Sequence, residues 1–242
     1  MELIPLPSTI QTTKKGPHEA IITIEPCYPG YGITLGNALR RVLLSSMPGS
    51  AITSVHIKGA PHEFTSLPGI KEDVVELMLN LKQVRVRCHS DQPQEVTLHV
   101  KGEKQVTAKD IQANQDVEIC NPDQPIATLT DKSSDFEMTL KVQNGRGYVP
   151  AEMQEKGNKE LGTILLDAIY TPVKNVNFDI EHVRVGEITN FDKVTLSIST
   201  DGSISPEEAF TTASQILVEH FNALVQREAT EPVKKKSKKS SE

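Results

Sequence analysis

Three glycines, Gly30, Gly32 and Gly36, lie between a predicted strand and a predicted helix, where dinucleotide-binding loops also lie. Such a loop would hold a pyrophosphate at the N-terminus of the helix. The spacing here is G-x-G-x-x-x-G, whereas the fingerprint is G-x-G-x-x-G, and no acidic residue follows a clear second parallel strand. We therefore interpret the glycines as permitting a tight start of the helix, and we keep a nucleotide-binding enzyme as an alternative. Nucleotide-dependent thermal stabilisation would favour that alternative.

The residue types that hydrolysis or metal chemistry requires do not form a motif. The sequence contains no G-x-S-x-G, no P-loop and no H-E-x-x-H pattern. His56 and His62 have no cysteine or carboxylate partner pattern, while Glu72, Asp73 and Glu76 fit the exposed side and first turns of a helix. Polymerase-type chemistry requires clustered carboxylates that hold two metal ions. The sequence thus predicts no catalytic residue, no metal site and no cofactor in this chain.

Residues 36–48 predict a helix with two separate contact surfaces. At 100° per residue, an apolar stripe about 140° wide contains Leu35, Ala38, Leu39, Val42 and Leu43. The opposite side contains Asn37, Arg40, Arg41 and Leu44. Arginine beside a large apolar side chain is a frequent composition of interface hot spots, and a solvated face with a single leucine is the alternative. We expect the first surface to be buried and the second to bind a partner.

The elements around this helix indicate a β-rich insertion. A strand over residues 18–25 precedes the helix, with Ala20, Ile22 and Ile24 on one face. Short alternating segments follow at 52–58, 84–88, 96–100, 117–119 and 136–142. One helix interrupts them, with apolar residues at helical spacing: Ile70, Val74, Leu77, Met78 and Leu81. Two longer strands are predicted at 176–185 and 193–200.

A final helix is well specified by its first residues. Ser205 is placed to cap it, Pro206 occupies the first helical position, and Glu208 completes a capping box. Its apolar side, about 140° wide, comprises Ala209, Phe210, Ala213, Ile216, Leu217, Phe221 and Leu224, with Val218 and Val225 widening it. This breadth predicts burial on more than one side, against its own sheet and a second subunit.

Length and composition indicate one or two globular domains with an aliphatic core. The 242 residues are 37% hydrophobic and 4% aromatic, with no Trp. No apolar run approaches the ~20 residues that cross a bilayer, and the first residues lack a signal-peptide pattern, so we expect a cytoplasmic protein. Cys27, Cys88 and Cys120 show no C-x-x-C spacing, which predicts reduced, mostly buried thiols rather than a disulfide framework or a zinc site.

Charge is distributed unevenly along the chain. The net charge is −6, yet six basic residues face three acidic ones from Gln226 onward. Because phosphate binding depends on Lys and Arg, the acidic body is not expected to bind nucleic acid. We expect residues 227–242 to form a disordered basic tail. Its lysine run, from Lys234 to Lys239, would contact DNA weakly or remain a solvated tail.

Residues 29–49, PGYGITLGNALRRVLLSSMPG, closely resemble the signature of the amino-terminal domain of the bacterial RNA polymerase alpha subunit. Further stretches agree with it in the right order, at 62–64 with 69–82, at 145–151 and at 205–209. The resemblance extends to about Val225. Family members usually continue through a linker into a carboxy-terminal domain that binds promoter DNA. The residues after Val225 are too few and too polar to be expected to fold into that domain, as in a truncated form or a natural short version, so promoter and activator contacts are not carried over.

The resemblance implies an α+β fold with two subdomains, in which a helix-plus-sheet dimerisation subdomain is interrupted by a β-rich insert. Applied to this sequence, it places the dimerisation subdomain at 1–48 and 170–226 and the insert at 49–169. In the family, the alpha homodimer starts assembly, and one alpha binds the beta subunit while the other binds beta-prime. The active centre belongs to those two largest subunits. The chain would therefore belong to a nucleoid-associated nucleotidyltransferase complex without performing the reaction itself.

Site residues follow from matching positions. Arg41 and Leu44, with the adjacent Arg40, are expected to contact beta. Lys82 and Leu166 are expected to hold beta-prime, although Lys82 is also explained as a helix C-terminal cation and Leu166 as a core residue. The expected dimer interface comprises apolar residues of the first and last helices: Leu35, Leu39, Val42, Leu43, Phe210, Ile216, Leu217, Phe221 and Leu224.

One related alternative stays open at this point. The archaeal and eukaryotic alpha-like polymerase subunits form heterodimers, and some carry cysteine clusters for zinc or iron–sulfur in the insert. The insert of this chain has only Cys88 and Cys120. Homodimerisation would separate the two cases.

Overall fold

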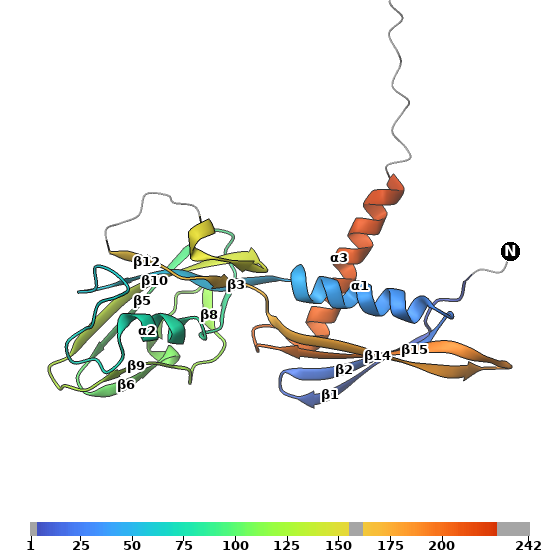
Figure 1. Ribbon diagram of the computed structural model, residues 1–242, viewed down its shortest axis with the longest axis horizontal. Coiled ribbons are helices and arrows are strands. Elements are labelled where there is room, and N and C mark those ends of the chain that lie inside the picture. The colour runs from blue at the N-terminus through green and yellow to red at the C-terminus, as the bar shows by residue number, and fades with distance from the viewer. Residues whose placement is uncertain (1–3, 155–161, 227–242) are drawn as a thin grey trace, which may run out of the picture.

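The computed structural model describes residues 4–154 and 162–226, which form two units joined side by side in an elongated molecule (Figure 1). Each unit has its own hydrophobic core. The mixture of three α-helices with extensive sheet in the described residues confirms the predicted α+β class. The predicted basic tail, including its lysine run, lies outside the described residues.

The first unit is a four-stranded antiparallel sheet covered on one face by two helices. Its strand order is β1 (Thr9–Gly16), β2 (Glu19–Cys27), β15 (Ile188–Thr200), β14 (Val173–Val185). The alternation predicted around Ile22 is confirmed, because Ala20, Ile22 and Ile24 are all buried, and the two isoleucines lie in one core with residues of both helices. β1 was not predicted from the sequence, since most of its side chains are exposed and show no alternation.

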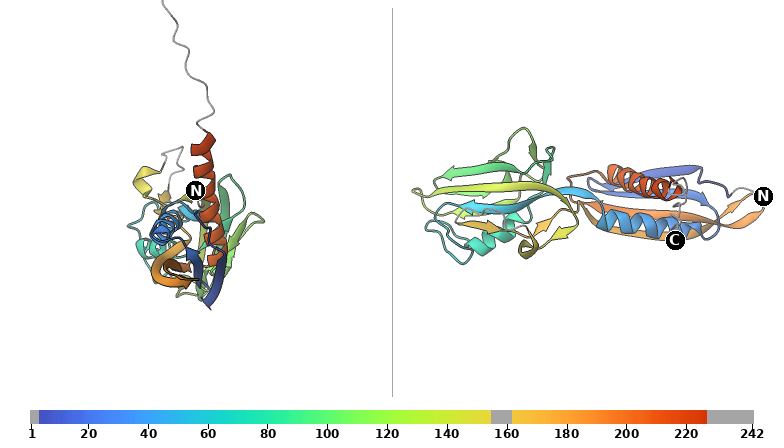
Figure 2. Two further views of the ribbon diagram at one scale, coloured as in Figure 1. Left: turned by 90° about the vertical axis from the view of Figure 1, so that its right-hand side faces the viewer. Right: turned by 90° about the horizontal axis from the view of Figure 1, so that it is seen from above.

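Helices α1 (Tyr31–Ser45) and α3 (Pro206–Gln226) lie next to each other over this sheet (Figure 2). The predicted bounds of the first helix, 36–48, were wrong at both ends. The helix begins directly after Gly30, whose positive φ of 85° turns the chain into it, and Pro48 already belongs to the next strand. Gly32 and Gly36 are therefore helical residues. A Cβ on Gly36 would come within 2.6 Å of the Phe178 ring, so glycine lets α1 approach the sheet closely.

The second unit is built mainly of strands. Its seven-stranded sheet has the order β7 (Ile111–Gln112), β5 (Gln94–Lys101), β10 (Asp135–Arg146), β3 (Pro48–Ile57), β4 (Val86–Cys88), β8 (Val117–Ile119), and β12 (Thr163–Leu165) pairs with β3. Two small sheets pair β6 (Lys104–Thr107) with β9 (Pro125–Leu129) and β11 (Tyr148–Val149) with β13 (Ala168–Ile169). Helix α2 (Val74–Leu81) and short 3₁₀ turns at Ala108–Asp110 and Ala151–Met153 complete it.

Helix α2 starts later than its apolar spacing suggested. Asp73 caps it by accepting a hydrogen bond from the Glu76 amide at 2.7 Å, whereas Ile70 precedes the helix and pairs with β9. Glu72 accepts a hydrogen bond from the Thr128 amide at 2.7 Å. The interpretation of these carboxylates as helix residues is thus confirmed for Glu76, in the first turn, whereas Asp73 is the N-cap and Glu72 precedes the helix and contacts β9.

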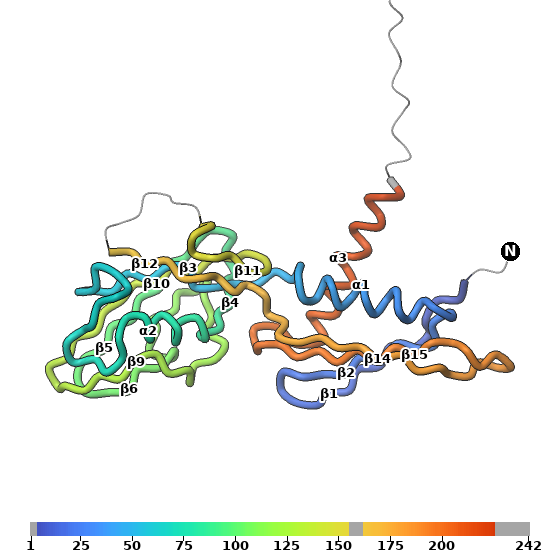
Figure 3. The backbone as a smooth tube through the Cα atoms, viewed as in Figure 1, coloured from blue at the N-terminus to red at the C-terminus, as the bar shows by residue number. Residues whose placement is uncertain are grey.

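The chain passes between the units twice, from α1 into β3 and from β13 back into β14 (Figure 3). Gly49 lies at the first crossing, where a Cβ would come within 1.8 Å of the Tyr170 carbonyl oxygen on the second. The two crossings are thus packed against each other. The subdomain bounds 1–48 with 170–226, and 49–169, stay our prediction, and the two separate cores support it.

Candidate protein-interaction surfaces

Helix α1 is attached to the sheet by one side and leaves the other side open. Leu39 and Leu43 are buried in the core of the first unit, Leu43 with 0% of its surface exposed. The protomer itself encloses both side chains, so the prediction that they contact a dimer partner is corrected. They hold α1 on its own sheet, whereas Leu35 and Val42 remain partly accessible at the edges of the same stripe.

The open side of α1 carries Asn37, Arg40, Arg41 and Leu44, all of them exposed. Arg40 is directed back to the sheet, since its Nε donates to the Val176 carbonyl oxygen at 3.1 Å. The described residues provide no hydrogen-bond acceptor or acidic partner for the guanidinium of Arg41. Arg41 and Leu44, three residues apart, therefore present a cation and an apolar side chain together to the outside.

A carboxylate from β15 fixes the start of α1. Asp192 is 3% exposed, and its Oδ2 accepts hydrogen bonds from the amides of Gly30 at 2.9 Å and Gly32 at 3.0 Å. His182 Nδ1 lies 3.4 Å from the other oxygen. Gly30 has no side chain to cap the helix, so Asp192 supplies the cap from a distant strand.

The Asp192 cap also decides how the glycine motif is interpreted. A phosphate would have to bind the amides at the start of α1, and the protein's own carboxylate already occupies them. A Cβ on Gly32 would lie 2.8 Å from the Cβ of Asp192, so this glycine makes room for the cap. The nucleotide-binding alternative is thereby contradicted.

Sequence reasoning missed Asp192, although a signal was present. The residue shares a strand face with Val194, Leu196 and Ile198, and a lone carboxylate on an apolar face demands a partner. Burial, together with the negative charge of Asp192, raises the pKa of the nearby Cys27 thiol above its ordinary value. Cys27, Cys88 and Cys120 are free thiols, and the first two are buried.

Helix α3 leaves the body of the protein along its second half (Figure 2). Its predicted capping box is confirmed, because Glu208 N donates to Ser205 Oγ and Ser205 N donates to the Glu208 carboxylate, both at 3.2 Å. Ala209 and Ala213 are buried against the sheet, but the large apolar residues further along are exposed: Val218 50%, Phe221 61%, Leu224 63% and Val225 74%.

The intermediate part of α3 connects these two regions. Phe210 and Leu217 pack partly against the core of the first unit, and Ile216 is partly buried. The stripe thus passes continuously from a buried start to an exposed end. Exposing an apolar helix side of this length to water is unfavourable, which indicates that it is an interaction surface.

In the second unit, the two residues predicted to hold beta-prime differ in exposure, since Lys82 is partly exposed and Leu166 is buried. Lys82 follows α2, and its Nζ lies 2.7 Å from Oδ2 of Asp167. The hydrogen bond from Lys82, with a second from the Ala151 amide at 2.9 Å, holds the pKa of Asp167 below its ordinary value. Leu166 is 0% exposed inside the core of the unit. Its predicted contact with beta-prime is therefore corrected, and Leu166 is a core residue.

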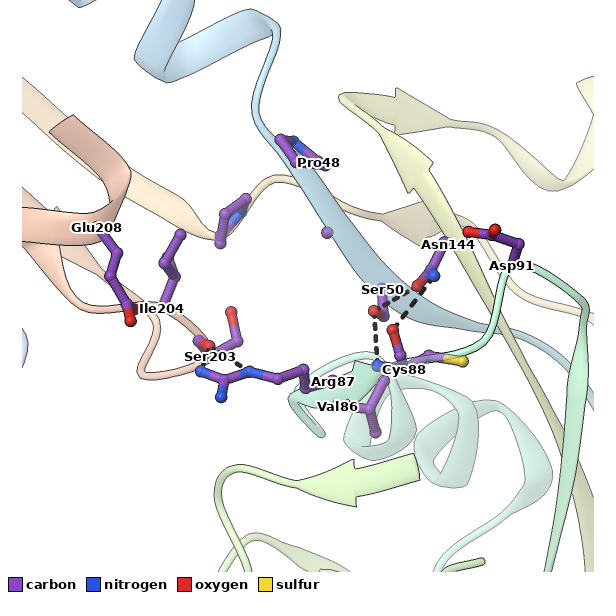
Figure 4. Close-up of a pocket in the computed structure, with 12 residues that line it drawn as sticks. Pro48, Ser50, Val86, Arg87, Cys88, Asp91, Asn144, Ser203, Ile204 and Glu208 are labelled. Carbon is purple, nitrogen blue, oxygen red and sulfur yellow. Dashed lines mark hydrogen bonds between the residues drawn. The ribbon is translucent and has the colours of Figure 1, made fainter. Parts of the chain in front are cut away.

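Within residues 4–154 and 162–226, no group of three or more His, Cys, Asp or Glu side chains is arranged to hold a metal ion. None of the described helices has the length and apolar character needed to span a membrane. A groove of about 450 Å³ lies between the two units, lined from both sides by residues that include Arg87, Asn144, Ser203 and Glu208 (Figure 4).

Comparison with known proteins gives consistent results. The model of the RNA polymerase Rpb3/RpoA insert domain matches residues 55–171. The chain is 52% identical over 202 residues to a DNA-directed RNA polymerase subunit alpha of Symbiobacterium thermophilum, covering 84% of this chain and 64% of that protein.

Two further relatives carry the same name. The identity is 48% over 216 residues for Carboxydothermus hydrogenoformans, covering 89% of this chain and 69% of the relative. For Lawsonia intracellularis it is 50% over 201 residues, covering 83% of this chain and 58% of the relative. The chain thus spans 58% to 69% of the length of these curated relatives.

Proposed function

Because the chain belongs to the family of bacterial DNA-directed RNA polymerase alpha subunits, we propose that it is a homodimeric platform on which the polymerase assembles in the bacterial cytoplasm. The observation that carries this proposal is the exposed apolar second half of α3. It lies on the same unit as the open side of α1. One unit therefore offers a surface for self-association and a different one for a larger partner.

The dimer interface in this proposal consists of residues that remain accessible in the protomer. They are Leu35, Val42, Phe210, Ile216, Leu217, Phe221 and Leu224, with Val218 and Val225 added from the exposed end of α3. In a two-fold dimer the same surface serves both subunits, so a helix that projects from one protomer covers its counterpart. A second copy is the natural partner of a self-complementary apolar stripe.

Dimerisation would give the assembly two identical α1 surfaces. Arg41 and Leu44, with Arg40 beside them, are the proposed contact with beta in one subunit, and the other subunit would meet beta-prime. Lys82 is the proposed contact of the second unit with beta-prime, by a side chain that its ion pair with Asp167 leaves 25% exposed. In this proposal catalysis belongs to the large subunits. DNA contact by the lysine run of the tail stays a weak, salt-sensitive expectation.

The self-association step is tested by light scattering coupled to size-exclusion chromatography. The chain should elute with twice its mass of 26.6 kDa at micromolar concentration. Phe221→Asp with Leu224→Asp should yield monomers, because two carboxylates cannot be buried unpaired in an apolar interface. Glu219→Gln, an exposed change on the same helix, is the matched control. A monomeric wild-type chain contradicts the proposal.

The second step is tested by recovery of the beta subunit on co-expression. Arg41→Ala should leave the dimer intact and abolish recovery of beta, since the arginine contacts no acidic group within the described protomer. Arg184→Ala, which changes an exposed arginine on the β14–β15 hairpin, should bind beta as the wild type does. Loss of dimerisation in Arg41→Ala would show that the two surfaces of α1 are wrongly assigned.

A further inference from the structure

Strand β4 presents its two faces to different units. Val84, Val86 and Cys88 are buried in the core of the second unit. Arg85 and Arg87 alternate with them and point the other way, toward the first unit. A short strand with an apolar face in one unit and a cationic face at the boundary is suited to joining the two.

Both arginines reach the turn between β15 and α3. Arg87 Nε donates to the Ser203 carbonyl oxygen at 2.9 Å, and a second guanidinium nitrogen donates to the same oxygen (Figure 4). Arg85 Nε lies 3.6 Å from Oδ2 of Asp201, whose side chain is only 6% exposed. Glu118, opposite Arg87 on β8, lies 3.8 Å from its guanidinium and steadies it from within the second unit.

The turn that receives the arginines is itself firmly held. Asp201 Oδ1 accepts from the amide and the hydroxyl of Ser203 at 2.9 and 2.6 Å, which leaves Oδ2 for Arg85. The Asp201 amide donates to the Pro172 carbonyl oxygen at 2.9 Å, on the segment that returns from the second unit. Since α3 begins five residues after Asp201, the arginines are tied to the base of the proposed dimer helix.

Among the described residues, no helix or strand of one unit is in extensive contact with a helix or strand of the other. Within residues 4–154 and 162–226, the chain crosses between the units at the start of β3 and before β14, and the groove lies between them beside Arg87 (Figures 3 and 4). Units connected by short crossings and a small polar contact move relative to each other by default. Hydrogen bonds to charged groups at the boundary are the means available to suppress that motion.

We propose that Arg85 and Arg87 are positioning residues that lock the orientation of the second unit against the β15–α3 turn. The lock keeps the open side of α1 and Lys82 at a fixed separation. The importance of that separation for binding the large subunits rests on the proposed function. The locking itself concerns only contacts within one chain.

Residual dipolar couplings measured on the full chain test the lock directly. If the two units are locked, their couplings fit one alignment tensor. If the second unit moves relative to the first, averaging reduces the magnitude of its tensor. In Arg85→Ala with Arg87→Ala, we expect the tensor of the second unit to shrink by about twofold relative to the first. Arg85→Lys with Arg87→Lys keeps both cations and should bring the two tensors back close to equality, which a general loss of packing would not allow.

Two further proteins complete the experiment. Lys58→Ala with Lys104→Ala removes two ion pairs inside the second unit and should leave a common tensor. Asp201→Asn with Arg87→Ala loosens the same boundary from the other side and replaces the double arginine variant if that one does not fold. Equal tensors in the loosened variants, or unequal tensors in the wild type, overturn the proposal. Neither result depends on dimerisation or on binding of beta, which are measured separately.

Discussion

The cap that Asp192 places on α1 predicts a large loss of stability for Asp192→Ala. The substitution removes two hydrogen bonds from Gly30 and Gly32 to a charged acceptor, and it leaves the buried Gly32 amide without a partner. Each such bond contributes about 1.5–3 kcal/mol, and burial of the lost charge opposes part of the sum. We expect a net loss of about 3 kcal/mol in the free energy of unfolding.

Differential scanning calorimetry measures this effect. For a chain of this size, a loss of about 3 kcal/mol lowers Tm by about 6–12 °C. Asp192→Asn keeps an oxygen acceptor but no charge, and should lose about half as much. Asp179→Ala changes an exposed carboxylate on the neighbouring strand and should leave Tm unchanged.

The ordering of these variants is the informative result. A Tm for Asp192→Ala within about 1 °C of the wild type would refute the reasoning, because the start of α1 would then not depend on the buried carboxylate. An equal drop in Tm for Asp179→Ala would also contradict the reasoning. The effect would then come from removing a negative charge from the sheet and not from losing the cap of α1.

Three further predictions follow from local geometry. Gly49→Ala should lower stability by about 2 kcal/mol or more by unfolding calorimetry, because the new Cβ meets the Tyr170 carbonyl oxygen. The pKa of Asp167 is held below 3.8 mainly by Lys82, so its contribution to stability is present above that pH and is lost as pH falls through the folded pKa. Lys82→Met should therefore flatten the fall of Tm below about pH 4. Cys27, buried and with a raised pKa, should not react with a thiol reagent at pH 8 until the protein unfolds.

Each of these has its own control. Gly16→Ala places a Cβ 3.9 Å from its nearest neighbour and should be tolerated. Lys174→Met changes an exposed lysine on β14, and its Tm should fall at low pH as that of the wild type does. In the denatured protein, all three cysteine thiols should react with the reagent. Wild-type behaviour of Gly49→Ala or Lys82→Met, or rapid labelling of native Cys27, would contradict the corresponding contact.

Much of the fold could be predicted from the periodicity of apolar residues and from helix-capping residues. Ile22 and its neighbours alternate as a half-buried strand must, and Ser205 with Glu208 identifies the start of α3. The bounds of α1 could not be predicted from the sequence. Gly32 and Gly36 weaken any local helix signal, and only contacts with Asp192 and Phe178 explain why glycine is required there.

The candidate surfaces were predictable only in part. The open side of α1 and the apolar side of α3 follow from helical geometry, but whether a given apolar residue faces the core or the exterior depends on the whole protomer. Leu43 and Leu166 were assigned to interfaces and are fully enclosed. Arg85 and Arg87 were not singled out from the sequence, because their partners Asp201 and Ser203 lie more than a hundred residues away along the chain.

In the proposed function, two copies of this chain together form a platform for one larger polymerase subunit. Native mass spectrometry of the complex recovered after co-expression with the beta subunit tests it most directly. We expect one dominant species with two copies of this chain and one copy of beta. A complex with a single copy of this chain, or a dimer that recovers no beta, would contradict it.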